Sequence, residues 1–201
     1  MDTTESPRIR VPRSAVFLDR DGTLVVERDW ILAPEALELE RGVAHGLADL
    51  GRSPHALCVV TNQSAVARGL LRVEELEAIH LRLRRLCAEA HAPLVDVMCC
   101  PHHPDEGRGA FRRACACRKP GHGLYATAAR LHGLDLAASW SIGDAARDAA
   151  AARAAGCRAV HVLTGKGRRE EAAARSAHPG ILVARDLAEA AETILSATPR
   201  T

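Results

Sequence analysis

The stretch that decides the fold is AVFLDRDGTL, residues 15–24, an apolar run that ends abruptly in two carboxylates. The run is short and rich in β-branched and aromatic residues, which predicts a buried strand. Asp19 and Asp21 follow where that strand ends, and Gly22 then breaks the pattern. Because a parallel sheet places its chemistry at the carboxyl ends of its strands, the two acids predict a site there. A turn that caps the strand is the alternative explanation for this D-x-D-G sequence.

The two acids also predict a metal ion. Asp19 and Asp21 repel each other unless they share a cation, since Arg20 is the only basic residue between them. Magnesium takes oxygen ligands and keeps several waters, so it suits such a pair.

The composition excludes several classes of protein. The chain has 201 residues, of which 47% are hydrophobic and 26% charged, and this suits one globular domain with a full core. A net charge of +2 and few aromatic residues argue against nucleic acid and anionic membranes as partners. Residues 1–14 lack the apolar centre of a signal sequence, and no apolar run approaches the length of a membrane span. We expect a cytoplasmic monomer with a single domain, residues 1–201, in which residues 1–13 are flexible.

Apolar runs and helical patterns alternate along the rest of the chain. After the first strand, the sequence predicts strands at residues 56–60, 94–99, 139–142, 159–163 and 181–183. It predicts helices at residues 41–50, 73–92, 123–132, 145–155 and 186–195, and an irregular flap at residues 24–40. This alternation predicts an α/β fold, a Rossmann-like parallel sheet with helices on both faces.

Two further strand ends carry polar groups that complement the first pair of acids. The second strand is followed by Thr61 and Asn62, a hydroxyl and an amide that can donate to a phosphoryl oxygen. The fourth strand ends at Asp144, and Asp148 follows one helical turn later. Each pair also has a simpler explanation, a turn at residues 61–62 and a helix N-cap at residues 143–144.

Two cations, Arg118 and Lys119, precede the helix that leads into the fourth strand. Read alone, they form a solvated surface pair. Read with the strand ends, they complete a set of groups that suits a phosphate bound together with magnesium: the acids hold the metal, while the cations and the hydroxyl hold the oxyanion.

A cluster of cysteines and histidines predicts a second metal. A C-x-H pair and a C-x-C pair, separated by twelve residues, offer three thiolates and one imidazole, which is the ligand set of a closed structural zinc site. The four candidate ligands are Cys100, His102, Cys115 and Cys117. Cys99 and His103 are alternative ligands, and small residues near a strand end are the alternative to a metal. Because Cys117 directly precedes Arg118, a zinc loop at residues 99–118 would fix both cations.

The order of the motifs DRDGT, TN, RKP and GDxxxD resembles that of the haloacid dehalogenase superfamily of phosphohydrolases. The resemblance implies that Asp19 is the nucleophile and that Asp21 is the general acid and then the general base. It implies that magnesium is held by Asp19, the backbone carbonyl of Asp21 and Asp144. It also implies that Thr61 and Lys119 stabilise the phosphoryl group during transfer.

The sequence of the zinc loop points to one family within this superfamily. Residues 100–104 read CPHHP, residues 115–120 read CACRKP, and residues 61–64 read TNQS. These stretches are similar to the D-glycero-D-manno-heptose-1,7-bisphosphate 7-phosphatases, small members of the superfamily without a large cap. The implied reaction removes the 7-phosphate of this phosphorylated sugar to leave heptose 1-phosphate. Alternatives are a phosphatase of the same mechanism for histidinol phosphate or another sugar phosphate, and an inactive zinc-stabilised binding protein.

The resemblance also implies where the substrate binds. Arg118 would help recognise the second phosphate or the sugar. The other expected substrate-binding residues are Asn62, Gln63, Ser64, Arg68, Arg28 and Trp30. The chain departs from the pattern at Val25 and Asp29 in the flap, and at Ala145, where the family commonly has Lys. These departures bear on substrate specificity rather than on chemistry, and the anomer of the sugar stays open.

Overall fold

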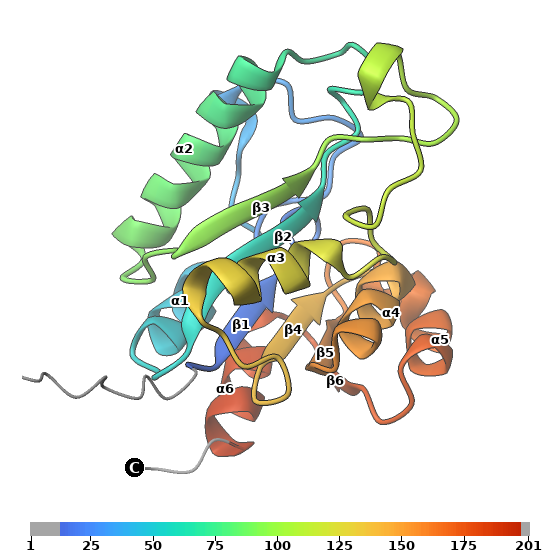
Figure 1. Ribbon diagram of the computed structural model, residues 1–201. Coiled ribbons are helices and arrows are strands. Elements are labelled where there is room, and N and C mark those ends of the chain that lie inside the picture. Colours follow the sequence, from blue (N-terminus) through green and yellow to red (C-terminus); the bar gives the residue numbers. More distant parts are fainter. Residues whose placement is uncertain (1–12, 198–201) are drawn as a thin grey trace, which may run out of the picture.

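The computed structural model describes residues 13–197, which form a six-stranded parallel sheet covered by helices (Figure 1). The strands are β1 (Ala15–Leu18), β2 (Ala56–Asn62), β3 (Asp96–Cys100), β4 (Trp140–Gly143), β5 (Arg158–Val162) and β6 (Leu182–Ala184). Their order is β3-β2-β1-β4-β5-β6, so the chain builds outward from β1 in one direction and then, from β4, in the other. The carboxyl ends of β1 and β4 therefore flank the point where the strand order reverses, which is where open α/β sheets bind ligands.

Within residues 13–197, six α-helices cover the two faces of the sheet. One face packs against α1 (Val43–Gly51), α2 (Val73–Glu89) and α6 (Leu187–Ala197). The other packs against α3 (Gly123–His132), α4 (Ala146–Ala155) and α5 (Gly167–Ala177). Short 3-10 helices lie at η1 (Pro34–Ala36) and η2 (Gly109–Phe111). None of the helices in residues 13–197 combines the length and apolar character needed to cross a membrane.

Strand β1 contributes to both layers of the core because its side chains alternate between the two faces. Val16 and Leu18 pack in the cluster that contains α1, α2 and α6, whereas Ala15 and Phe17 pack in the cluster that contains α3 and α4. All four residues are fully buried. A strand buried on both faces reads as a continuous apolar run, as residues 15–18 do.

The structure confirms the predicted fold class and adds one helix that the sequence pattern missed. Helix α5 has the sequence GRREEAAARSA, without a large apolar side chain, and buries only Gly167 and Ala174. With so small an apolar stripe, the helical period is absent from the pattern. Element ends also differ by about two residues: α1 begins at 43 rather than 41, and β3 covers 96–100 rather than 94–99.

The expected flexible N-terminus falls almost wholly on residues 1–12, which lie outside the described part of the chain. Arg13, the last residue of that stretch, is held by its main chain. Its N–H donates to the carbonyl of Gly133 at 3.2 Å, and its carbonyl accepts from the N–H of Asp135 at 3.1 Å.

Two irregular segments extend past the carboxyl edge of the sheet and frame the site. One is the flap between β1 and α1, and the other is the excursion between β3 and α3, drawn yellow-green in Figure 1. The flap begins with a tight turn at Gly22, whose φ is +76°. A Cβ at this position would lie 2.1 Å from Oδ2 of Asp144, so glycine alone allows the turn to pass so close to that acid.

Candidate functional site

Three buried carboxylates meet at the carboxyl ends of β1 and β4. Asp19 directly follows β1, and its N–H donates to the carbonyl of Ile142 in β4 at 2.9 Å. Asp144 directly follows β4, and Asp148 lies in the first turn of α4. Each of the three offers an oxygen that lies within 4.8 Å of the other two. Carboxylates this close repel one another strongly unless cations lie between or beside them.

Lys119 supplies one of those cations. Its Nζ donates to Oδ1 of Asp19 at 2.7 Å and to the carbonyl of Val60 at 2.8 Å, and lies 2.7 Å from Oδ1 of Asp148. Burial alone would lower the pKa of Lys119, but Asp148 and Asp19 raise it above its ordinary value. The amine therefore stays protonated and holds Asp19 in a fixed orientation.

The pKa values of the acids diverge because their partners differ. Burial raises the pKa of Asp19, but the charges of Lys119 and Arg147 outweigh this, and the net pKa lies below the ordinary value. Burial, and then the charge of Asp19, raise the pKa of Asp144 to about 7. Its Oδ2 accepts the N–H of Lys166 at 2.7 Å, but its buried Oδ1 has no hydrogen-bond partner within residues 13–197. A buried carboxylate oxygen without a partner, beside two further acids, suits a divalent cation that prefers oxygen ligands.

Asp21 lies at the mouth of the same site rather than in the carboxylate cluster. Its side chain is 21% exposed, and its Oδ1 accepts from Nη2 of Arg20 at 2.9 Å. Its Oδ2 accepts from Nε2 of Gln63 at 2.6 Å, and the same Nε2 donates to the hydroxyl of Thr61 at 2.8 Å. Oε1 of Gln63 accepts from Arg20 at 2.7 Å. Gln63 therefore orients both Asp21 and Thr61, a role that the sequence did not indicate.

The side chain of Asn62 holds the main chain of Lys119. Its Nδ2 donates to the carbonyl of Lys119 at 3.0 Å, and its Oδ1 accepts the N–H of Lys119 at 3.0 Å. These two hydrogen bonds hold the end of β2 against Lys119, whose amine is buried in the site.

An open cavity lies outside these groups, between the flap and the ends of the strands. Of the seven residues expected to bind substrate, six line it: Arg28, Trp30, Asn62, Gln63, Ser64 and Arg118. Arg68 is not among the lining residues. It forms an ion pair with Glu106 of the excursion, and its guanidinium lies over the Trp30 ring, 5.1 Å from the ring centre, so it packs against the indole.

Two further cations line the cavity that the sequence did not predict there, Arg147 and Lys166. Arg147 follows Asp144 by three residues and so lies in the first turn of α4. Lys166 lies in the loop after β5 and forms an ion pair with Glu27 of the flap. The position of Arg147 inside GDxxxD could have indicated its place, whereas nothing local marks Lys166.

Val25, Ala145 and Asp29, which depart from the family pattern, lie in different surroundings. Val25 is fully buried and forms backbone bridges with Asp21 and Leu39, so it does not line the cavity. Ala145 is also buried, and its N–H donates to Oδ2 of Asp148 at 3.0 Å. Asp29 alone is exposed and lines the cavity.

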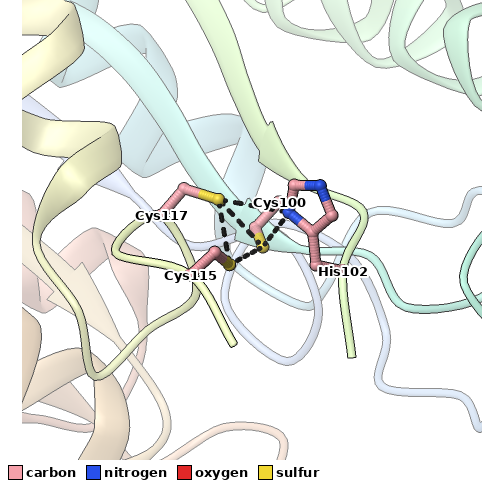
Figure 2. A group of neighbouring side chains, drawn as sticks. All are labelled: Cys100, His102, Cys115 and Cys117. Atoms are coloured by element: carbon pink, nitrogen blue, oxygen red, sulfur yellow. Dashed lines mark hydrogen bonds between the residues drawn. The ribbon is translucent and has the colours of Figure 1, made fainter. Parts of the chain in front are cut away.

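The excursion between β3 and α3 holds a second cluster, built from Cys100, His102, Cys115 and Cys117 (Figure 2). The three sulfur atoms lie 3.2–3.6 Å apart. Nδ1 of His102 lies 3.6 Å from the sulfur of Cys100 and 3.4 Å from that of Cys117. Three sulfurs and one ring nitrogen therefore face a common centre.

The alternative ligands point elsewhere. Cys99 precedes Cys100 on β3, so its side chain faces the opposite side of the sheet and packs against the cluster that contains α1 and α2. Nδ1 of His103 accepts N–H bonds from Asp105 at 3.3 Å and Glu106 at 3.0 Å. The geometry brings together the four residues that the spacing favoured and leaves both alternatives outside.

Comparisons with known proteins agree with this fold and site. A HAD-hydrolase-like family model matches residues 116–190. The D-glycero-beta-D-manno-heptose-1,7-bisphosphate 7-phosphatases of Pseudomonas aeruginosa and Bordetella bronchiseptica are each 37% identical to this chain. These alignments cover 91% and 90% of this chain, and 98% and 97% of the relatives. The chain belongs to this phosphatase family.

Solved structures of heptose-bisphosphate phosphatases have the same fold. The crystal structure of the D,D-heptose 1,7-bisphosphate phosphatase from B. bronchiseptica, complexed with magnesium and phosphate, is 36% identical with a TM-score of 0.81. The one from Burkholderia thailandensis is 29% identical with a TM-score of 0.67. Each match covers 92% of this chain and 99% of the other. Membership of the heptose-bisphosphate phosphatase family confirms that the protein is an enzyme of the HAD hydrolases, as the motifs predicted.

Proposed function

We propose that this phosphatase removes the 7-phosphate of D-glycero-β-D-manno-heptose 1,7-bisphosphate and releases heptose 1-phosphate. The observation that carries the proposal is the buried Asp19 whose pKa is lowered by Lys119 and Arg147, beside a cavity lined by five cations and three acids of residues 13–197. An ionised carboxylate at this position can attack phosphorus, and the cations suit a substrate with more than one phosphate. The relatives that share almost the full length of the chain carry this activity in their names.

We infer that magnesium is bound by Asp19, Asp144 and the main-chain carbonyl of Asp21. The unpartnered Oδ1 of Asp144 and the raised pKa of that acid support a cation here, and the B. bronchiseptica structure holds magnesium together with phosphate. When bound, such an ion neutralises the oxygens of the phosphoryl group. Asp148, the third member of the carboxylate cluster, is occupied by Lys119 and by the N–H of Ala145.

The residues of the chain then divide the reaction into two steps. The carboxylate of Asp19 attacks phosphorus while Asp21 gives its proton to the departing alcohol oxygen, leaving an aspartyl-phosphate. Asp21 next takes a proton from water, which attacks the phosphorus and releases phosphate from Asp19. Thr61 and Lys119 hold the phosphoryl oxygens during both transfers. The bonds from Arg20 and Gln63 fix the orientation of the Asp21 carboxyl group.

We infer that the Cys/His cluster binds a structural zinc ion. Five of the six distances between the ligand atoms are 3.2–3.6 Å, and a tetrahedron with edges of this length has its centre ~2.1 Å from each corner, close to the Zn–N and Zn–S bond lengths of ~2.0–2.3 Å. Four protein ligands leave no open position, so this metal would hold the excursion rather than take part in the reaction. It would also fix Arg118, whose Nη1 donates to the carbonyl of His102 at 3.0 Å.

The test compares three substrates with purified, magnesium-supplied enzyme. We expect kcat/KM for heptose 1,7-bisphosphate to exceed that for histidinol phosphate and for an aryl phosphate by at least ~100-fold. Equal turnover of the bisphosphate and the aryl phosphate would contradict the proposed substrate. Faster turnover of histidinol phosphate would favour the related specificity on the same scaffold. The expectation of a cytoplasmic monomer stays a prediction, and light scattering in solution measures the oligomeric state.

A further inference from the structure

Arg147 is a cation of the cavity whose charge helps to lower the pKa of Asp19, but the mechanism above gives it no contact with the substrate. It lies in the first turn of α4 and lines the cavity. Its Nε is buried, and its guanidinium makes no hydrogen bond and no ion pair within 4.0 Å with any of residues 13–197. Buried or half-buried charges in folded proteins are normally paired, so an unpaired guanidinium facing a cavity indicates a missing anionic partner.

The other cations that line the cavity already have partners. Arg20 bonds Asp21 and Gln63, and Arg28 pairs with Glu38 at 2.7 Å. Lys166 pairs with Glu27, and Arg118 donates to a backbone carbonyl of the excursion. Among the described residues around this cavity, Arg147 is therefore the cation whose terminal N–H donors, those of its two Nη atoms, have no partner and can take a ligand.

The position of Arg147 separates it from the groups that hold the reacting phosphoryl group. Asp19, Thr61 and Lys119 are buried and do not line the cavity, whereas Arg147 does. The acids nearest to Arg147 act on it through charge alone, since neither Asp19 nor Asp148 lies within ion-pair distance of its guanidinium. A substrate bound at Asp19 would place the remainder of its structure, beyond the ester oxygen, in the space that Arg147 faces.

We propose that Arg147 binds the phosphate that the enzyme does not hydrolyse and so helps determine the preference for a bisphosphate. The proposal rests on the proposed function, in that the substrate carries a second phosphate. A guanidinium takes a phosphate through two parallel N–H···O bonds, a geometry that a lysine cannot reproduce.

The experiment measures kcat and KM for heptose 1,7-bisphosphate and for heptose 7-phosphate in three variants. In Arg147→Met, the KM for the bisphosphate rises by roughly 10- to 100-fold, the factor for one lost charge-assisted contact, while the KM for the monophosphate changes by less than about 3-fold. Arg147→Lys restores part of the loss. Arg153→Met is the matched control, since Arg153 lies on the same helix, is exposed and donates to the carbonyl of Ala177 instead of facing the cavity.

Two outcomes would overturn the assignment. An equal fall in kcat for both substrates would make Arg147 a counter-ion of the buried acids or a contact to the reacting phosphoryl group. Unchanged kinetics in Arg147→Met would make it a surface residue.

A failure of the proposed function is seen separately, in the wild-type enzyme, as no preference for heptose 1,7-bisphosphate. In that case, the role of Arg147 in binding a second phosphate is tested with sugar phosphates as inhibitors of aryl phosphate hydrolysis. Stronger inhibition by fructose 1,6-bisphosphate than by fructose 6-phosphate, lost in Arg147→Met, supports the assignment. An advantage of the bisphosphate that is absent from the wild type, or that survives in Arg147→Met, contradicts it.

Discussion

The two clusters at the carboxyl edge of the sheet differ in how complete they are. The Cys/His cluster consists of four ligand atoms that face one centre and needs nothing further from solvent or substrate. The carboxylate cluster has three acids, one amine in direct contact and an oxygen of Asp144 with no partner within residues 13–197. A closed ligand set suits a structural metal. An incomplete set suits a metal whose remaining coordination positions are taken by water or by the substrate. Substitutions in the Cys/His cluster should therefore act through the structure of the excursion, and substitutions in the carboxylate cluster should act on the reaction itself.

The largest expected effect tests the incomplete cluster. Replacing the nucleophile in Asp19→Asn lowers kcat by on the order of 10³-fold or more, because an amide oxygen does not form the acyl phosphate. Steady-state release of phosphate measures the loss, and circular dichroism confirms that the variant is folded. Asp105→Asn, an exposed acid of the excursion, is the control and keeps its activity. Near-normal turnover in Asp19→Asn would contradict the nucleophile assignment.

The next effect tests the closed cluster. In Cys115→Ser/Cys117→Ser, bound zinc falls from about one ion per chain to none, and activity falls by ~10- to 100-fold because Arg118 and Lys119 lose their anchor. Elemental analysis of protein purified without chelator measures the metal. Cys99→Ala is the matched control, since this neighbouring cysteine faces the other side of β3. Wild-type protein that contains no metal would contradict the zinc assignment.

A smaller effect separates positioning from binding inside the catalytic site. Gln63→Leu preserves the approximate volume but removes the donors to Asp21 and Thr61, so we expect kcat to fall by ~10-fold with little change in KM. The same fall is expected for sugar and aryl phosphates. A higher KM with unchanged kcat would instead support substrate binding by Gln63, which is what the sequence motif indicated.

The smallest effect is a pH dependence of stability. The pKa of Asp144 rises from 3.8 to about 7 on folding, so in this range the folded chain binds more protons than the unfolded chain. The free energy of unfolding of magnesium-free enzyme therefore falls as the pH rises from about 4 to about 7.

The variant Asp144→Asn has no titrating group at this position, so it lacks this pH-dependent contribution to the free energy of unfolding. Relative to wild type, it gains on the order of 1–3 kcal/mol across that window and no more above it. Urea unfolding of both proteins at about pH 5 and about pH 8 measures the gain. A constant difference between the two proteins would show that Asp144 is already ionised in the folded chain at the lower pH.

Much of the fold could be predicted because the strands are short apolar runs that end at polar motifs. The parallel sheet and its two helical layers follow from that alternation, but the order of the strands does not, since it depends on how each connection crosses the sheet. Helix α5 escaped prediction because it buries little more than Ala174. The amphipathic signal is proportional to the apolar surface that a helix covers, and this helix covers very little.

The candidate site was predictable where residues lie at strand ends and less so where side chains interact across the sheet. Asp19, Asp144 and Lys119 could be placed from topology alone, and the structure brings them together. Gln63 was expected to bind substrate, but its bond to Asp21 joins residues 42 positions apart and depends on rotamers. Arg68 was likewise expected at the substrate, which stays a prediction, and its contacts with Trp30 and Glu106 depend on side-chain rotamers in the same way. Spacing identifies the types of groups at a site, whereas only coordinates show their partners.

The contacts of Arg68 have a consequence for protein engineering. Arg68 pairs with Glu106 of the excursion and supports Trp30 of the flap, while the N–H of Arg108 donates to the carbonyl of Ala67 at 2.8 Å. The flap, the loop after β2 and the excursion are far apart in the sequence but contact one another, so they should be exchanged together when parts of related enzymes are combined. A chimera that takes its flap, its excursion and the loop after β2 from a single parent keeps these contacts, whereas a chimera that mixes parents keeps the side-chain contacts of Arg68 only where the second parent supplies matching residues.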